Sequence, residues 1–173
     1  QLPRFFIESF TQPDDIIYDP FAGRGTTAIE AALLGRIPIS NDINPLSRIL
    51  CEPRLRPPSV LEVEKRLADI FSRTLKTEPD IDLSMFYHPQ TFAEILHLRH
   101  YLQTIKEIAD SVDDWIRMVA TNRLTGHSKN FFSVYTMPPN QAVGAEEQIR
   151  INRKRKQSPT YKSVKEIILA FNP

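Results

Sequence analysis

The sequence predicts an α/β fold in which a short parallel sheet is followed by a mainly helical insertion. Two apolar runs that are typical of strands, residues 16–18 and 37–40, flank a helical pattern over residues 26–34. A strand–helix–strand unit of roughly 30 residues requires parallel pairing with a right-handed crossover. Only these two strands can be predicted, whereas such a sheet normally has several. We therefore expect a partial sheet.

The composition indicates an ordinary globular protein. The chain has 173 residues, of which 41% are hydrophobic and 25% are charged, so it can bury a core without disulfides or metals. A single cysteine, Cys51, excludes an internal disulfide and fits a reducing, cytoplasmic setting. No apolar run approaches the ~20 residues that span a bilayer, and no signal peptide is visible. Because the chain begins with Gln1, we expect either that it is cut from a longer protein or that its first residues are not seen.

The first region, residues 1–52, contains the predicted sheet. Residues 2–10 form a predicted helix, and residues 16–18 follow a turn and read as a buried strand. The helix over 26–34 should bury one face and end at Gly35. That face carries Ile29, Ala32 and Leu33.

The second region, residues 57–125, reads as a helical insertion, and we interpret it as a target-recognition region. Ser59 with Glu62 forms a predicted capping box, and Thr91 with Glu94 repeats the signal. A third helix is predicted over 112–122. His88, His97 and His100 lack the further ligands that a zinc site needs, so we expect them to be structural, and no metal is predicted.

The third region, residues 126–173, is a basic C-terminal segment. We expect a short extended piece over 131–135, a break at Met137-Pro138-Pro139 and a last helix over 163–171. Net charge is only +1, yet seven basic and no acidic residues lie between positions 148 and 165. Such a block suggests an anionic partner, with nucleic acid as the first candidate, or else a solvated, partly disordered tail. The predicted nucleic-acid-binding residues are Arg150, Arg153, Lys154, Arg155 and Lys156.

The motif most informative about chemistry lies between the first predicted strand and the first crossover helix. Gly23 and Gly25 allow a sharp turn and a close approach to a ligand. The helix that begins at Thr26 directs free N–H groups toward an anionic ligand group. Asp42 follows Asp19 by 23 residues, where a nucleotide-binding fold places an acid on the ribose. We favour a nucleotide-like ligand over a plain structural turn.

Three segments resemble the cofactor half of the DNA amino-methyltransferases, which methylate the exocyclic nitrogen of adenine or cytosine. They are residues 2–10, Asp19-Pro20-Phe21-Ala22-Gly23-Arg24-Gly25-Thr26-Thr27 and Asp42-Ile43-Asn44-Pro45, and the resemblance covers residues 2–50. It implies a partial Rossmann-like methyltransferase sheet, S-adenosylmethionine as cofactor and DNA as partner. A companion restriction enzyme, a dimer or a missing C-terminal half would each fit this family.

The resemblance also implies roles for individual residues. Asp19 would hold the methionine amino group, and Asp42 would accept hydrogen bonds from the ribose. Ile43 would flank the adenine, and Phe21 would line the site near the methyl donor. The methionine part would be surrounded by Ala22, Gly23, Gly25 and Thr26.

The family's catalytic motif, a polar residue followed by Pro-Pro-aromatic, is not matched. The nearest string, Thr136-Met137-Pro138-Pro139-Asn140, lacks the polar residue before the prolines and the aromatic after them. We read it as a turn and predict no catalytic residue in this chain, which suggests an N-terminal fragment of a longer enzyme.

Three alternatives remain open from the sequence. An RNA guanine amino-methyltransferase would have a similar glycine turn followed by an acid. A nucleic-acid-binding module without catalysis would explain the basic block. A nicotinamide dinucleotide site is a weaker alternative, because Ala28 stands where that fingerprint has its third glycine.

Overall fold

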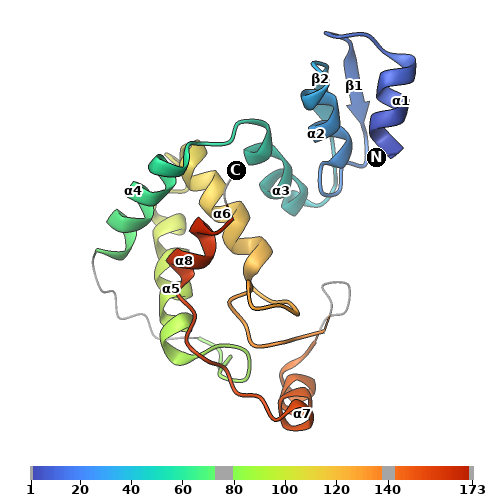
Figure 1. Ribbon diagram of the computed structural model, residues 1–173. Coiled ribbons are helices and arrows are strands. Elements are labelled where there is room, and N and C mark those ends of the chain that lie inside the picture. The colour runs from blue at the N-terminus through green and yellow to red at the C-terminus, as the bar shows by residue number, and fades with distance from the viewer. Residues whose placement is uncertain (1, 73–79, 138–142, 172–173) are drawn as a thin grey trace. The chain divides into compact units, whose positions relative to one another are not determined.

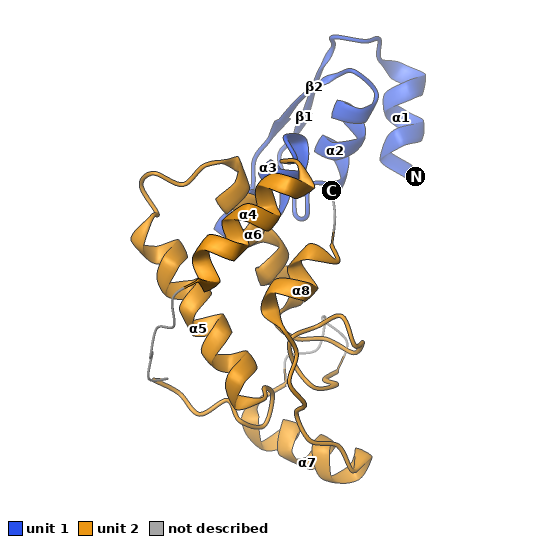
Figure 2. Cartoon of the chain, turned by 60° about the vertical axis from the view of Figure 1, so that its left-hand side comes forward, with its two compact units in different colours: residues 1–57 blue, residues 58–173 orange. Residues whose placement is uncertain are grey.

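The computed structural model describes residues 2–72, 80–137 and 143–171, and these form two compact units (Figures 1 and 2). Unit 1 spans residues 1–57 and unit 2 spans residues 58–173. Unit 1 contains the predicted sheet. Apart from Pro57, the predicted helical region 57–125 lies in unit 2 together with the basic segment 126–173.

Unit 1 is an α/β structure built on a two-stranded parallel sheet (Figure 1). Strands β1 and β2 pair in register from Ile16 opposite Ile37 to Asp19 opposite Ser40. Helix α2 packs on both strands and on the neighbouring helices α1 and α3. The element bounds are α1 Leu2–Phe10, β1 Ile16–Asp19, α2 Thr26–Leu33, β2 Ile37–Ser40 and α3 Pro45–Leu55.

The strands and α2 agree with the predicted positions, but their burial does not. The prediction that residues 16–18 form a buried strand is wrong, since Ile16 is 64% exposed and Tyr18 is 59% exposed. Alternate residues of a strand point to opposite faces, and β1 alternates between exposed and half-buried positions. The predicted apolar face of α2 is also wrong, because Ala28 and Ala31 are buried while Leu33 is 72% exposed. Alanines suit this helix because it packs among several elements at once.

Unit 2 is helical in its described elements and contains α4 Val60–Phe71, α5 Pro89–Thr104, α6 Ser111–Arg123, α7 Ala145–Arg155 and α8 Val164–Leu169. Helices α4, α5, α6 and α8 pack against one another (Figure 2). Trp115, Met118 and Val119 of α6 are buried as predicted. Further fully buried side chains are Leu67, Ile116, Phe132, Val164 and Ile168.

The predicted capping box of α4 is confirmed, whereas the one predicted for α5 is wrong. The Ser59 hydroxyl accepts from the Glu62 N–H, and Glu62 accepts from the Ser59 N–H. Helix α5 begins earlier, at Pro89, with His88 as its N-cap. Thr91 is instead buried inside α5, and its Oγ1 lies 2.8 Å from the Lys162 carbonyl oxygen. The Thr91 hydroxyl therefore forms a tertiary hydrogen bond, which could not be predicted from the spacing of residues in the sequence.

Asp110 and Asp113 form a capping box at the start of α6 that the sequence reading missed. Both carboxylates also pair with Arg66 of α4. Asp113 is almost fully buried, and it accepts a further hydrogen bond of 3.0 Å from the Tyr101 hydroxyl of α5. This charged cluster therefore links three helices.

The C-terminal third differs from the prediction in two places. The extended piece predicted over 131–135 forms only an isolated bridge between Gly126 and Tyr135, because Phe132 turns inward and is buried in the core. A partly disordered tail was one of the two interpretations of the basic block, but residues 148–155 of this block form most of helix α7. Pro138 to Asn140, at the predicted break, lie outside the described residues.

Two of the three histidines that were predicted to be structural, His88 and His97, have structural contacts. The His97 ring packs edge-on against Phe71, and the His88 ring nitrogen accepts from the Gln90 N–H. Among the described residues, His, Cys, Asp and Glu side chains form no group of three that could hold a metal ion. No helix in the described ranges has the length and apolarity needed to cross a membrane.

Candidate functional site

The loop between β1 and α2 is a tight turn that depends on its two glycines. Asp19 Oδ1 accepts a hydrogen bond of 3.0 Å from the Phe21 N–H. The Gly25 N–H then donates to the Ala22 carbonyl at 2.7 Å. Gly23 has φ +53° and Gly25 has φ +79°, the left-handed region that strongly favours glycine. The predicted turn therefore exists, and both glycines are required by the backbone.

A second loop, after β2, is bonded directly to this glycine loop. The Asn41 N–H donates to the Asp19 carbonyl and the Ala22 N–H donates to the Asn41 carbonyl, both at 2.9 Å. Parallel strands end at the same edge of a sheet, which is where open α/β sheets bind ligands. The register of β1 with β2 thus brings two loops together that are about 20 residues apart in sequence.

The Asp42 carboxylate joins the two loops through both of its oxygens. Oδ2 accepts from the Gly23 N–H at 2.7 Å, and Oδ1 accepts from the Asn44 N–H at 2.8 Å. Hydrogen bonds to the ionised form lower a carboxyl pKa, and the Asn44 N–H, followed by the Gly23 N–H, lowers the pKa of Asp42. The carboxylate is consequently ionised at neutral pH.

Helix α3 forms another wall of the site and was not predicted. Its start carries a clear signal, because Asn44 Oδ1 caps the Leu46 N–H at 3.0 Å and Pro45 occupies the first turn. Pro53 lies inside the helix and obscured the pattern. Buried residues of α3 include Ser47 and Cys51. Signals at Asn44 and Pro45 were therefore sufficient to find the helix start.

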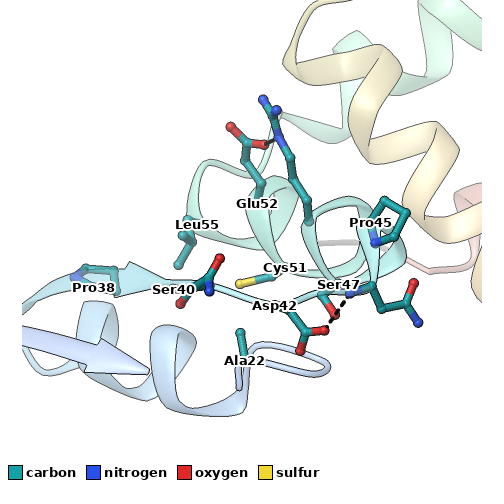
Figure 3. Close-up of a pocket in the computed structure, with 12 residues that line it drawn as sticks. Ala22, Pro38, Ser40, Asp42, Pro45, Ser47, Cys51, Glu52 and Leu55 are labelled. Carbon is teal, nitrogen blue, oxygen red and sulfur yellow. Dashed lines mark hydrogen bonds and ion pairs between the residues drawn. The ribbon is translucent and has the colours of Figure 1, made fainter. Parts of the chain in front are cut away.

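A pocket of about 430 Å³ lies between the loop after β2 and helix α3 (Figure 3). This volume is within the range of small-molecule sites. Asp42 and Ala22 come from the two loops, and Cys51 projects from α3 (Figure 3). The remaining lining residues are Pro38, Ser40, Asn41, Asn44, Pro45, Ser47, Arg48, Glu52 and Leu55.

Gly25 and Cys51 are in very close contact beside this pocket. A Cβ atom at position 25 would lie 2.3 Å from the Cys51 Sγ, so α3 can approach the glycine loop only because residue 25 has no side chain. Burial raises the pKa of the Cys51 thiol, so the thiol itself is uncharged at neutral pH.

The structure brings together most, but not all, of the predicted cofactor residues. Asp19, Ala22, Gly23 and Asp42 are hydrogen-bonded within the paired loops, and Gly25 packs on Cys51. Thr26 begins α2 and is exposed.

Phe21 and Ile43 stand apart from this group, because they project into solvent and are 86% and 101% exposed. Ser40, Ser47 and Cys51 line the pocket and were missed, since their positions depend on β2 and α3 rather than on a motif.

Comparison with known proteins shows which class of protein this site is similar to. Residues 1–47 match the model of the DNA methylase family. The resemblance to the DNA amino-methyltransferases is therefore confirmed over this stretch, which contains both paired loops. No solved structure matches the chain.

Two curated relatives give more particular names. The type II methyltransferase M.MjaII of Methanocaldococcus jannaschii is 32% identical over 74 residues, which cover 43% of this chain and 14% of that protein. The type II methyltransferase M.PvuII of Proteus hauseri is 33% identical over 84 residues, or 49% of this chain and 24% of that protein. The chain thus matches less than a quarter of the length of either relative.

Proposed function

We propose that unit 1 binds S-adenosylmethionine as the cofactor part of a DNA methyltransferase of a restriction–modification system. The enzyme would transfer a methyl group to an exocyclic amino nitrogen of adenine or cytosine. The main support is that the family match over residues 1–47 includes both loops joined by Asp42, which lines the pocket. On this proposal, β1, α2 and β2 are one part of a Rossmann-like sheet.

The donors and acceptors of the two paired loops fit this cofactor. Each Asp42 oxygen accepts one backbone N–H, and Ser47 contributes a side-chain hydrogen bond. A carboxylate has about four lone-pair sites, so one is left for a ribose hydroxyl. Gly23 is exposed and would leave the backbone open to the methionine part. Gly25 packs on Cys51 and would shape the turn beside that part, and Thr26 begins the helix that would face its carboxylate. Asp19 would meet the methionine amino group.

The two exposed apolar residues also support a ligand with an aromatic base. Phe21 lies two residues after Asp19 and Ile43 directly follows Asp42, and neither is covered by the described residues. Covering such side chains with a purine would remove apolar surface from water, at about 25 cal/mol per Å². We assign Ile43 to one side of the adenine and Phe21 to the vicinity of the methyl donor.

Methyl transfer from this cofactor needs little activation by the protein. S-adenosylmethionine supplies a methyl group on a positively charged sulfur. The residues of unit 1 would position it for in-line transfer. The sequence contains no Pro-Pro-aromatic motif, so the proposal gives this chain cofactor-binding roles and no catalytic residue.

Calorimetric titration of the chain with S-adenosylmethionine tests the proposal. We expect one site per chain, and Asp42→Ala should weaken binding about tenfold or more, on the order of 1.4 kcal/mol. Because Asp42 also supports the glycine loop, Asp42→Asn is the sharper variant, since it keeps the size and one acceptor oxygen.

A control that changes the ligand distinguishes the contact of Asp42 with the ribose from its structural role in the glycine loop. S-adenosylhomocysteine and its 3′-deoxy analogue should bind the unchanged chain with different affinities, and Asp42→Asn should reduce that difference. Failure of a folded sample to bind either ligand would contradict the proposal. The match to the DNA methylase family favours DNA over RNA as substrate, and methylation of transfer RNA in place of DNA would overturn that choice.

A further inference from the structure

The basic block of unit 2 divides into residues that maintain the fold and residues that face solvent. Lys162 belongs to the first group, because its Nζ donates to the Phe131 and Ser133 carbonyls at 2.8 and 2.5 Å. Burial lowers its pKa. The second group is exposed on α7 and directly after it, and we name it the α7 surface. It consists of Arg150, Arg153, Lys154 and Lys156.

A polar network fixes the opposite, buried face of α7. Gln148 is fully buried, and its Nε2 donates to the Tyr135 carbonyl at 2.9 Å and to Asn152 Oδ1 at 2.8 Å. Asn152 Nδ2 donates to the Met85 carbonyl at 2.8 Å. Gln157, just beyond the helix, donates to the same Tyr135 carbonyl at 3.0 Å. Buried hydrogen bonds of this kind specify one orientation of a helix.

Arg155 adds a further restraint. Its guanidinium lies 3.7 Å from the centre of the Tyr135 ring, within cation–π range. Tyr135 therefore holds α7 through both its carbonyl and its ring. Positions 150, 153 and 154 are spaced by three and four residues, so they share one helical face. The network leaves this face in solvent, already ordered before any partner binds.

The charge of this face is strongly one-sided. Acidic residues of α7 are confined to its first turn, where Glu147 lies 3.3 Å from Arg150 in an exposed pair. The last turn is basic in three consecutive positions, and Lys156 follows at the C-cap. An exposed pair contributes little, so the surface remains available to an external polyanion.

We propose that the α7 surface contacts the phosphate backbone of double-stranded DNA. The proposal rests on the proposed function in one respect, which is that DNA is the substrate. Arginine and lysine side chains contacting phosphates contribute affinity and position but no sequence preference. Because α7 is held by its buried face, less conformational entropy is lost on binding than for a mobile tail. Arg155 is assigned to holding the helix.

Fluorescence anisotropy with labelled DNA duplexes of two unrelated sequences tests this proposal. The chain is compared with the triple variant Arg150→Gln, Arg153→Gln, Lys154→Gln. Lys156 is left unchanged because its φ of +50° makes its backbone sensitive to substitution. We expect at least a tenfold loss of affinity for both duplexes. The slope of log affinity against log salt should fall by up to about 2.7, or 0.9 for each phosphate contact.

A charge-matched variant, Lys65→Gln, Arg99→Gln, Lys106→Gln, removes the same number of exposed charges elsewhere in unit 2. It should keep most of the affinity. Equal losses in the two variants, or unchanged binding by the α7 variant, would overturn the proposal. A larger loss for double-stranded RNA than for DNA would overturn the choice of DNA.

Circular dichroism and calorimetry complete the test. An unchanged helical signal and melting temperature would attribute the loss to charge. Misfolding is addressed by Arg153→Gln alone, for which we expect a slope reduction of about 0.9. S-adenosylmethionine binding by the α7 variant should be unchanged, so failure of the cofactor proposal would be seen separately from failure at α7.

Discussion

Gly25 is the residue at which backbone conformation and packing both exclude a side chain. Its φ is +79°, and an added Cβ would lie 2.3 Å from the Cys51 Sγ. We expect Gly25→Ala to destabilise unit 1 by about 2–4 kcal/mol, from left-handed strain and overpacking together. Displacement of the loop should also abolish S-adenosylmethionine binding. Urea denaturation and calorimetric titration measure the two effects.

Gly35 provides a matched control for this prediction. Its φ is +72°, yet a Cβ there would meet nothing within 4 Å. Gly35→Ala should therefore cost only the strain, about 1 kcal/mol, and leave cofactor affinity unchanged. Equal destabilisation by the two substitutions would contradict the importance of the contact between Gly25 and Cys51.

At the scale of elements, Arg66 connects α4 to the start of α6. It pairs with Asp110 and with Asp113, which is almost fully buried. Removal of one partner of a buried pair leaves an uncompensated charge, which typically costs about 3–5 kcal/mol. Because the Tyr101 hydroxyl still donates to Asp113, we expect Arg66→Met to cost about 2–4 kcal/mol in urea denaturation. A loss below about 0.5 kcal/mol, which is usual at surface sites, would contradict this role.

The same cluster should make stability depend on acidic pH. The hydrogen bond from Arg66 lowers the pKa of Asp110 from 3.8 to about 2. The stabilisation is therefore fully present above pH 3.8 and decreases as pH falls toward 2. The side chain of Asp110 is half exposed, so the effect should be small and reduced by salt. Denaturation curves from pH 5 to 2 should show a weaker pH dependence for Asp110→Asn than for the unchanged chain.

At the scale of the whole molecule, the candidate cofactor site belongs to one of the two units. All lining residues of the pocket lie in unit 1. Some amides exchange their hydrogen only when the binding site opens. A ligand present at one hundred times its Kd slows the exchange of these amides about a hundredfold. We therefore expect S-adenosylmethionine to protect amides of β2 and α3 in hydrogen-exchange measurements and to leave α5 and α6 unchanged. Protection confined to unit 2 would place the ligand elsewhere.

The local elements of unit 1 were predictable because their signals lie close together in the chain. The strand–turn–helix–strand order, the two glycines and Asp42 follow from short-range pattern and turn chemistry. Helix α3 was not predicted, although Asn44 and Pro45 are typical of a helix start. Pro53 lies within it, and a proline inside a segment disfavours a helical prediction. Ser47 and Cys51 could not be connected with the glycine loop from sequence, because their contacts depend on how α3 packs.

The sequence by itself determined the α/β character of the first region, the glycine turn and the resemblance to the DNA amino-methyltransferases. Only the tertiary structure decided how polar groups are used. Asp42 accepts hydrogen bonds from both loops. Thr91 donates to the Lys162 carbonyl and does not cap α5. The Lys162 ammonium donates to the Phe131 carbonyl inside unit 2 and is not part of the exposed basic surface. A sequence motif reflects the local conformation that the backbone needs. A buried polar group must form a hydrogen bond, and the tertiary packing determines which partner lies close enough.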